Sequence, residues 1–213
     1  MRSHFDEQLA QLNKDMIDMG TMVEESISKA VNALIRQDEK LARQVAAGDG
    51  EIDRAERKIE DLCIRLLLRQ QPVAKDLRNI SAALKMVTDM ERIGDHAADI
   101  SELAMVLCKK PYVKQFDHIE EMAKETMVML IQSLEAYVDK DLDKAEKVIA
   151  HDDVVDELFE KIKKELVEMI RSHADEGEQA VDILMVTKYF ERIGDHATNI
   201  AEWVIFSITG ERE

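Results

Sequence analysis

The chain has 213 residues, of which 45 are acidic and 29 basic, giving a formal net charge of −16 at pH 7. This balance excludes bulk binding of nucleic acid, because phosphate backbones are bound by clustered lysine and arginine side chains. Hydrophobic residues make up 46%, which is enough for a core, but 7 glycines and 2 prolines are too few for the turns of a β-sandwich or a doubly wound sheet. We therefore expect an all-α protein.

The N-terminus and the cysteines bear on where the protein is located. Asp6 and Glu7 stand where a secretory signal would need an apolar stretch. No apolar run in the sequence approaches the roughly 18 residues that span a bilayer. Cys63 and Cys108 lie at no metal-ligand or redox spacing and indicate buried, reduced thiols. These features favour a cytoplasmic protein without a transmembrane segment, which associates with a membrane only through partners.

Six long helices are predicted between a few helix-breaking residues. Pro72 and Pro111 should each end a helix, because proline lacks the amide hydrogen that the next turn needs. Further breaks are expected at 36–38, 138–141 and 172–178. The intervening stretches, roughly 28 to 35 residues each, carry apolar residues at helical spacing.

The six predicted helices form two sets of three. Residues 91–97 recur as residues 191–197 with seven identities, Glu-Arg-Ile-Gly-Asp-His-Ala, at an offset of 100. In the preceding helices the match has an offset of 103, as for Asp53 and Asp156. We interpret this as an internal duplication, in which residues 1–109 and residues 110–213 each form an antiparallel three-helix bundle.

Acids occupy one side of the helix that carries each repeated segment. At 100° per residue, Glu91, Asp95 and Asp99 fall within about 80° of one another and lie opposite the apolar residues. The second copy has the equivalent residues Glu191, Asp195 and Asn199. Like charges four residues apart repel each other on a helix, so a compensating interaction is expected.

The preceding helix of each repeat carries a matching acidic stripe. In the first repeat this stripe consists of Asp49, Asp53, Glu56 and Glu60. The second repeat keeps Asp152 and Asp156 but has Phe159 and Lys163 at the positions of Glu56 and Glu60. Folding each hairpin about its turn brings the two stripes level, with no lysine or arginine expected between them. Converging carboxylates predict a site for hard cations, whereas a solvated acidic face is the alternative. The expected ligands are Asp49, Asp53, Glu91, Asp95 and Asp99 in the first repeat and Asp152, Asp156, Glu191, Asp195 and Asn199 in the second.

Other residues of the repeated segment have less specific interpretations. Gly94 and Gly194 indicate close approach of either a neighbouring helix or a ligand, because a mid-helix glycine costs about 1 kcal/mol relative to alanine. His96 and His196 point about 100° away from the stripe, which favours a hydrogen bond over metal ligation. Arg92 lies at the edge of the stripe and should pair with a neighbouring acid.

An enzymatic function is not predicted. Di-iron oxidases need Glu-x-x-His pairs that face a four-helix core, and none of the 6 histidines has an acid three residues before it. The acidic stripes also lie opposite the apolar sides, so they should face outward. The sequence contains neither a nucleophile motif nor a glycine-rich phosphate loop.

These features together resemble the PhoU family of accessory regulators of phosphate-specific transport. The resemblance rests on two three-helix repeats, each with the Glu-Arg-Ile-Gly-Asp-His segment and an upstream Asp-x-x-x-Asp, and it extends over residues 5–208. The segments that match the metal motifs of the family are Asp49 to Asp53, Glu91 to Asp95, Asp152 to Asp156 and Glu191 to Asp195. Asn199 is a departure, because the first repeat has Asp99 at the equivalent position.

The resemblance implies a negative regulator of the phosphate-starvation response. Such a protein links the phosphate ABC transporter, through its PstB-like ATPase subunit, to a PhoR-like sensor histidine kinase and modulates phosphate uptake. The resemblance also implies a homodimer without catalytic activity, and metal ions at carboxylate sites, with iron first and zinc, manganese or magnesium as alternatives. Two other functions remain open: an accessory protein of a low-affinity phosphate permease, and a metal-buffering helical protein.

Overall fold

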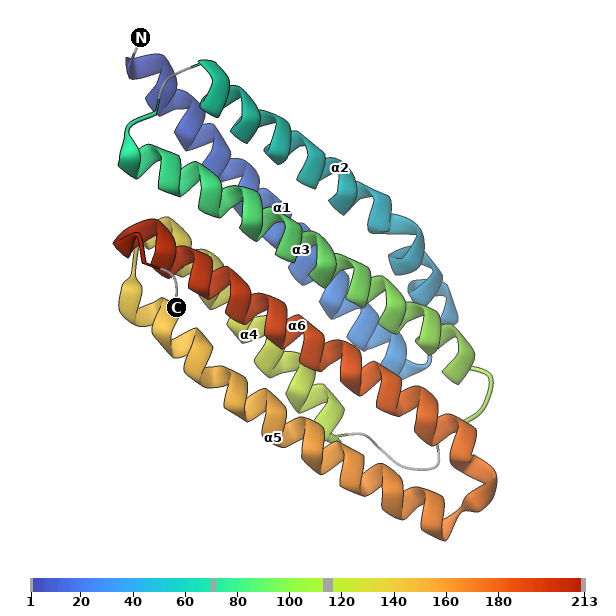
Figure 1. The fold of residues 1–213 in the computed structure, drawn as a ribbon. Coiled ribbons are helices and arrows are strands. Elements are labelled where there is room, and N and C mark those ends of the chain that lie inside the picture. The colour runs from blue at the N-terminus through green and yellow to red at the C-terminus, as the bar shows by residue number, and fades with distance from the viewer. Residues whose placement is uncertain (1, 70–71, 113–116, 212–213) are drawn as a thin grey trace.

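The described parts of the chain form six long α-helices in two tandem bundles (Figure 1). The computed structural model describes residues 2–69, 72–112 and 117–211, and within these ranges it contains no strand. The elements are α1 (Arg2–Arg36), α2 (Glu39–Arg69), α3 (Ala74–Leu107), α4 (Asp117–Asp139), α5 (Leu142–Ser172), the 3₁₀ helix η1 (Ala174–Glu176) and α6 (Gly177–Thr209). The predicted all-α fold is confirmed.

The helix ends follow the breaks that the sequence predicts. Residues 37–38, 140–141 and 173–176 separate consecutive long helices. α4 spans 23 residues of the described chain and is thus shorter than expected. Residues 108–110 form turns before Pro111, and the described part of α4 begins only at Asp117.

The turns that precede α2 and α5 have the same local structure. Gln37 and Lys140, which are equivalent at the offset of 103, have positive φ angles of 51° and 55°. Asp38 and Asp141 follow them, and each carboxylate accepts a hydrogen bond of 3.0 Å from the backbone amide three residues later. Such a bond satisfies an amide that the first helical turn leaves unpaired. The local sequence therefore determines where α2 and α5 begin.

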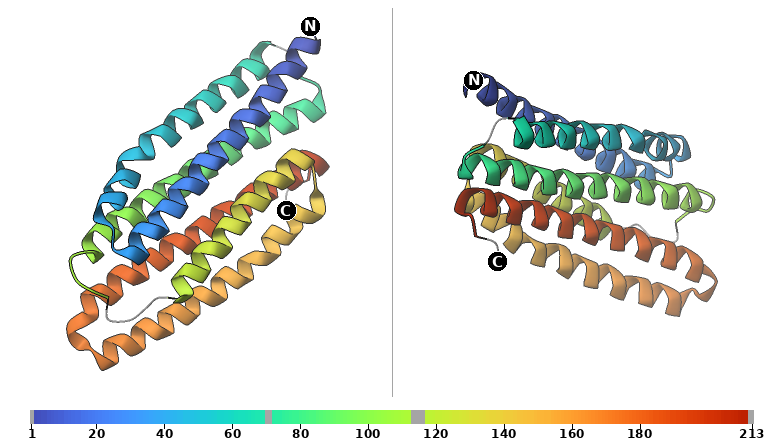
Figure 2. Two further views of the ribbon diagram at one scale, coloured as in Figure 1. Left: turned by 180° about the vertical axis from the view of Figure 1, so that it is seen from behind. Right: turned by 45° about the horizontal axis from the view of Figure 1, so that its top comes forward.

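The two bundles lie side by side along their length. α1, α2 and α3 pack as one antiparallel bundle, and α4, α5 and α6 pack as the other. α3 packs against α6 and α1 packs against α4, while α2 and α5 lie on the outer flanks (Figure 2). The contact between bundles is therefore made by four helices, two from each repeat.

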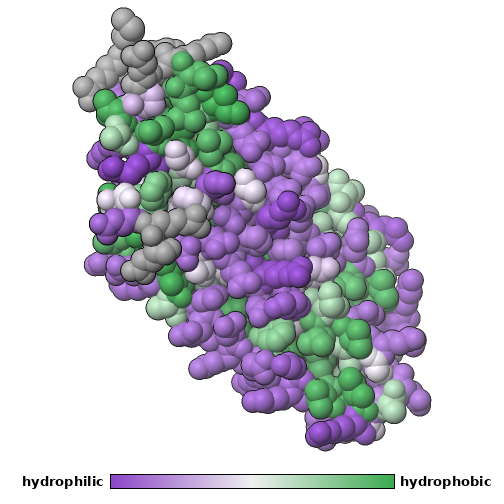
Figure 3. Space-filling model, in the orientation of Figure 1, coloured by the Kyte–Doolittle hydropathy of each residue, from purple (hydrophilic) through white to green (hydrophobic). Residues whose placement is uncertain are grey.

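α3 and α6 are the most enclosed helices, because each packs within its own bundle and against the other. The predicted apolar sides are buried in both copies, at Ile93, Ala97, Ile100, Ile193, Ala197 and Ile200. Cys63 is buried as expected, whereas Cys108 at the end of α3 is only half buried. No helix in the described ranges is long and apolar enough to cross a bilayer. The face in Figure 3 is largely hydrophilic along the middle of the molecule.

Candidate metal centre

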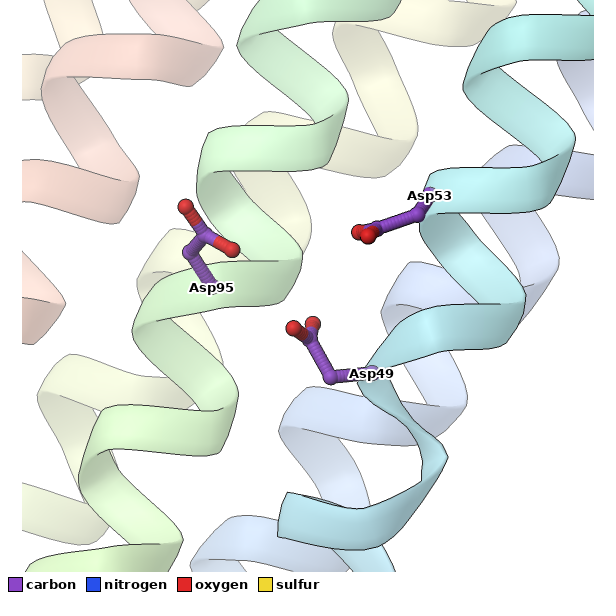
Figure 4. Close-up of side chains that lie close together, drawn as sticks. All are labelled: Asp49, Asp53 and Asp95. Carbon is purple, nitrogen blue, oxygen red and sulfur yellow. The ribbon is translucent and has the colours of Figure 1, made fainter.

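Three aspartates from two helices converge in the first repeat (Figure 4). Asp49 and Asp53 project from α2 and Asp95 projects from α3, and one oxygen of each lies within 4.8 Å of the other two. All three residues are half buried at the edge of the core. The structure thus brings together three of the predicted ligands at the height that the antiparallel register requires. We refer to them as the aspartate triad.

Partial burial and mutual repulsion act on the carboxyl groups of this region. Desolvation raises the pKa of Asp49, and the charges of Asp95 and Asp53 raise it further. Desolvation and Asp95 also raise the pKa of Glu91, against the opposing charge of Arg92. A bound cation would relieve this repulsion, and an all-oxygen donor set suits a hard metal ion. The residues present therefore fit a metal of this class.

Glu56 extends the acidic region along α2, although it is not among the expected ligands. Desolvation raises its pKa to about 7, with further contributions from Glu91, Glu60 and Asp53. Its position three residues after Asp53 on the same helix side was visible in the sequence. That spacing could have placed Glu56 among the expected ligands.

Two arginine side chains lie beside the triad. Arg92 approaches Glu91 to 3.5 Å and Asp95 to 3.0 Å, and Arg57 lies 3.6 Å from Asp53. The expected pairing of Arg92 with a neighbouring acid is therefore confirmed. Residues three or four positions apart on a helix face each other, so these arginines reach the acids along their own helices. Their side chains are 55% and 72% exposed, so water screens the attraction.

Two predicted ligands of the first repeat lie outside the aspartate triad. Glu91 and Asp99 are half buried on α3, one turn before and one turn after Asp95. Asp99 lies 3.5 Å from Nδ1 of His96. Both interact with the triad through charge. The charge of Asp99 raises the pKa of Asp49, and the charge of Asp95 raises the pKa of Glu91.

The second repeat does not reproduce the triad. Within the described parts of the chain, the only three acids or other metal-ligating side chains that meet within 4.8 Å are those of the first repeat. The pKa of Asp152 is raised to about 6, chiefly by desolvation and then by the charges of Asp156 and Asp195. These three carboxylates are therefore electrostatic neighbours that do not converge, and both Asp156 and Asp195 are exposed.

A lysine partly neutralises the acids of the second repeat. Lys188 forms a close ion pair with Glu191, one turn further along α6. It also opposes the rise in the pKa of Asp195 that desolvation and Glu191 cause. The first repeat has Thr88 at the equivalent position. The spacing of three residues between Lys188 and Glu191 is visible in the sequence and predicts an ion pair on the helix.

Asn199 and the two histidines of the repeated segment face the contact between bundles. Nδ2 of Asn199 donates a hydrogen bond of 3.2 Å to Asp89, and Nδ1 of His196 lies 2.8 Å from the same oxygen. The ring of His96 stacks on Tyr189 with centroids 5.4 Å apart. His196 thus contacts Asp89, seven positions before His96, and His96 contacts Tyr189, seven positions before His196. Asp89 was missed because the packing of one bundle on another leaves no spacing signal within a single helix.

The two motif glycines allow close approach of the neighbouring helix. A Cβ at Gly94 would lie 2.9 Å from Cδ1 of Ile52 on α2. A Cβ at Gly194 would lie 3.3 Å from both Oδ1 of Asp152 and Cγ1 of Val155 on α5. Tight helix packing therefore accounts for Gly94, whereas at Gly194 a predicted ligand is among the groups that approach.

A family comparison matches both repeats. The PhoU domain model matches residues 16–104 and 119–204. The chain belongs to the PhoU family. It is 40% identical over 212 residues to the phosphate-specific transport system accessory protein PhoU homolog of Clostridium acetobutylicum, covering 99% of this chain and 97% of that relative. The PhoU homolog of Synechocystis is 39% identical, with 100% and 94% covered.

Crystal structures of PhoU proteins have the same architecture. PhoU from Pseudomonas aeruginosa has a TM-score of 0.93 at 35% identity and covers 97% of this chain and 100% of its own. The phosphate transport system regulatory protein PhoU from Streptococcus pneumoniae has a TM-score of 0.92 at 27% identity, with 98% and 99% covered. The two tandem three-helix bundles are therefore the PhoU fold.

Proposed function

We propose that this PhoU-family chain is an accessory and regulatory protein of phosphate-specific transport. The observation that carries the proposal is similarity along the whole chain to relatives that are named as accessory proteins of that system. The likeness includes the second repeat as well as the first, and it extends to the fold at TM-scores above 0.9. The proposal concerns binding and regulation, without a catalytic step.

In the finer form of this proposal, the protein acts in the cytoplasm as an adaptor. It contacts the ATPase subunit of the phosphate ABC transporter and the cytoplasmic part of a PhoR-like sensor histidine kinase, and it represses the phosphate-starvation response when phosphate is plentiful. Long helices offer extended surfaces for two partners, and a net charge of −16 would steer basic partner surfaces toward them. The resemblance to the family supports a homodimer as the active form.

The aspartate triad is the part of the proposal that concerns a metal. Asp49, Asp53 and Asp95 would hold one hard cation, with iron first and zinc, manganese or magnesium as alternatives. When bound, the ion would supply positive charge and a link between α2 and α3. It would thereby stabilise the first bundle and reduce its negative surface charge.

The deciding experiment measures binding of the purified protein to the transporter ATPase subunit and to the cytoplasmic portion of the kinase. Each measurement is made on metal-free protein and on protein loaded with Fe²⁺ or Mn²⁺. Binding to both partners supports the adaptor, and a difference between the two metal states assigns the triad a part in signalling. Binding to neither partner in either state would overturn the proposal in favour of a permease accessory or a metal buffer.

A further inference from the structure

An apolar groove runs between α1 and α4, at the back of the molecule as drawn in Figure 1 and at the front in the left view of Figure 2. It has a volume of about 450 Å³, and most of its wall surface is apolar. Ile17 and Val138 line it and are 44% and 41% exposed, respectively. No other part of the described chain covers this apolar surface, and a groove of this kind can receive the apolar side chains of a partner.

The groove lies at the seam between the two repeats. Its lining residues fall at 17–24 on α1 and 130–139 on α4, which is about two to three turns on each helix. A Cβ on Gly20 would overlap Cδ1 of Leu134, so the glycine keeps that leucine in its place on the wall. Any occupant would therefore contact both bundles at once.

The rim of the groove is acidic. Glu24, Glu135 and Asp139 line it together with one basic residue, Lys144. Nζ of Lys144 lies 3.1 Å from Glu135 and 3.2 Å from Asp139, so one ammonium already serves two carboxylates. The rim thus retains negative charge, and its two paired carboxylates have side chains that are 54% and 59% exposed.

We propose that this groove docks an amphipathic helix with a basic polar face from a protein partner. A two-turn trough between two helices accepts apolar side chains at positions i, i+3, i+4 and i+7 of a third helix. The acidic rim would pair with lysine or arginine on the sides of that helix. The identity of the partner rests on the function proposed above, but the chemistry of the helix follows from the groove alone.

Charge argues against a second copy of this chain as the occupant. Each copy carries a formal net charge of −16, so two copies meeting at an acidic rim would repel each other. A cationic helix would instead gain from the rim and from the field of the whole protein. Self-association through the groove is nevertheless an outcome that the test below detects.

The test uses the full-length protein and three labelled synthetic peptides of about 14 residues. The first has leucines at i, i+3, i+4 and i+7 with lysine elsewhere. The second has the same composition in an order without an apolar face, and the third replaces lysine by glutamate. Fluorescence anisotropy at about 0.15 M salt gives the Kd values, because salt at that level screens general attraction to an acidic protein.

Ile17→Lys and Val138→Lys place a repelling charge in the groove at exposed positions, where the fold tolerates it. Ile35→Lys is the matched control, since Ile35 is 41% exposed on the same helix as Ile17 and lies outside the groove. Gly20→Ala tests shape without charge, because it forces Leu134 from its position on the wall. Thermal melts of all four variants verify folding.

We expect the amphipathic lysine peptide to bind at least about tenfold more tightly than either comparison peptide. Ile17→Lys and Val138→Lys should each remove that preference. Gly20→Ala should weaken it, and Ile35→Lys should leave it intact. Equal binding of the lysine peptides, or an unchanged preference in both groove variants, would overturn the proposal. So would self-association of the wild-type protein, measured by sedimentation velocity, that Ile17→Lys abolishes and Ile35→Lys does not, because the occupant would then be a second copy.

The same variants separate this inference from the proposed function. If the wild-type protein binds the transporter ATPase subunit or the kinase, and Ile17→Lys and Val138→Lys bind equally well, the groove is not their docking site and the adaptor function stands. If the wild-type protein binds neither partner but retains its preference for the amphipathic peptide, the adaptor function fails and the groove stands.

Discussion

The two repeats share a seven-residue segment and a bundle architecture, yet they differ at equivalent acidic surfaces. In the first repeat, Asp49, Asp53 and Asp95 converge within 4.8 Å. In the second, Asp152 interacts electrostatically with Asp156 and Asp195 without such convergence. The repeated segment itself is therefore not sufficient to build the triad.

Residues outside the repeated segment account for the difference in charge. The first repeat places Glu56 beside the triad, and the second places Phe159 at that position. Nζ of Lys163 and Nζ of Lys188 lie 5.9 and 5.4 Å from the centroid of the Phe159 ring. Cations can stack on such a face, so the second surface gathers positive charge where the first gathers carboxylates.

Removing one carboxylate from each repeat gives the largest expected effect. Asp95→Asn should weaken Fe²⁺ or Mn²⁺ binding by at least about 100-fold, because even loss of an outer partner of a metal ligand costs about 10- to 100-fold. Asp195→Asn, the equivalent change, should alter the affinity by less than about tenfold. Titration calorimetry on metal-free protein measures both.

Neither substitution should unfold the bundles, and circular dichroism of both variants tests this. Equal losses in the two variants would show that the second repeat holds metal as well as the first. An unchanged affinity in both would remove the metal assignment altogether.

The motif glycines give the next comparison. Gly94→Ala should lower the free energy of unfolding by about 1–2 kcal/mol, because overpacking against Ile52 outweighs the gain of about 1 kcal/mol in helix propensity. Gly194→Ala should change it by less than about 1 kcal/mol, since its closest contacts are at 3.3 Å. Urea unfolding followed by circular dichroism measures both, and a larger loss at Gly194 would contradict the packing argument.

Much of the fold could be predicted from the sequence because its signals are local. The scarce prolines, the aspartate N-caps and the apolar spacing each act within one helix or one turn. Even the register of α2 against α3 followed, since a short hairpin fixes which residues lie level. Asp53 and Asp95 were therefore placed together from sequence alone.

The rest of the site depends on contacts that periodicity does not encode. The position of Asp89 against His196 and Asn199 requires the packing of α3 on α6, which follows from the combined shape of two bundles. The pKa of Asp195 likewise depends on its neighbours, because the charge of Lys188 opposes the rise that desolvation and Glu191 cause. The replacement of Asp99 by Asn199 already indicates that the second site is less charged, and the structure adds that its carboxylates do not converge.

Lys188→Thr sharpens the comparison by giving the second repeat the residue of the first. The change frees Glu191 from its ion pair and removes a cation that opposes the rise in the pKa of Asp195. Affinity for Fe²⁺ or Mn²⁺ at the second repeat should rise severalfold. The increase is modest because the lysine is 42% exposed and its charge is screened. The measurement is titration calorimetry in an Asp95→Asn background, and an unchanged affinity there would mean that the geometry of α5 and α6 limits binding.

Glu56→Gln gives the smallest effect, seen as a change in pH dependence. The pKa of Glu56 is about 7 in the folded protein against 4.5 for an unperturbed glutamate, so the folded state binds this proton more tightly than the unfolded state. Its contribution is fully stabilising below about pH 4.5 and is lost as the pH rises through 7. In metal-free protein, the stability of the variant minus that of wild type should thus be greater at pH 8 than at pH 5. We expect a difference of about 0.5–1 kcal/mol after allowing for solvent screening, or about 1–4 °C in Tm. Glu51→Gln, whose side chain is 70% exposed on the same helix, is the control and should leave the two Tm differences equal. If Glu56→Gln also leaves the two Tm differences equal, repulsion among the first-repeat carboxylates is weaker than their burial implies. The contrast between the repeats would then lie in geometry alone.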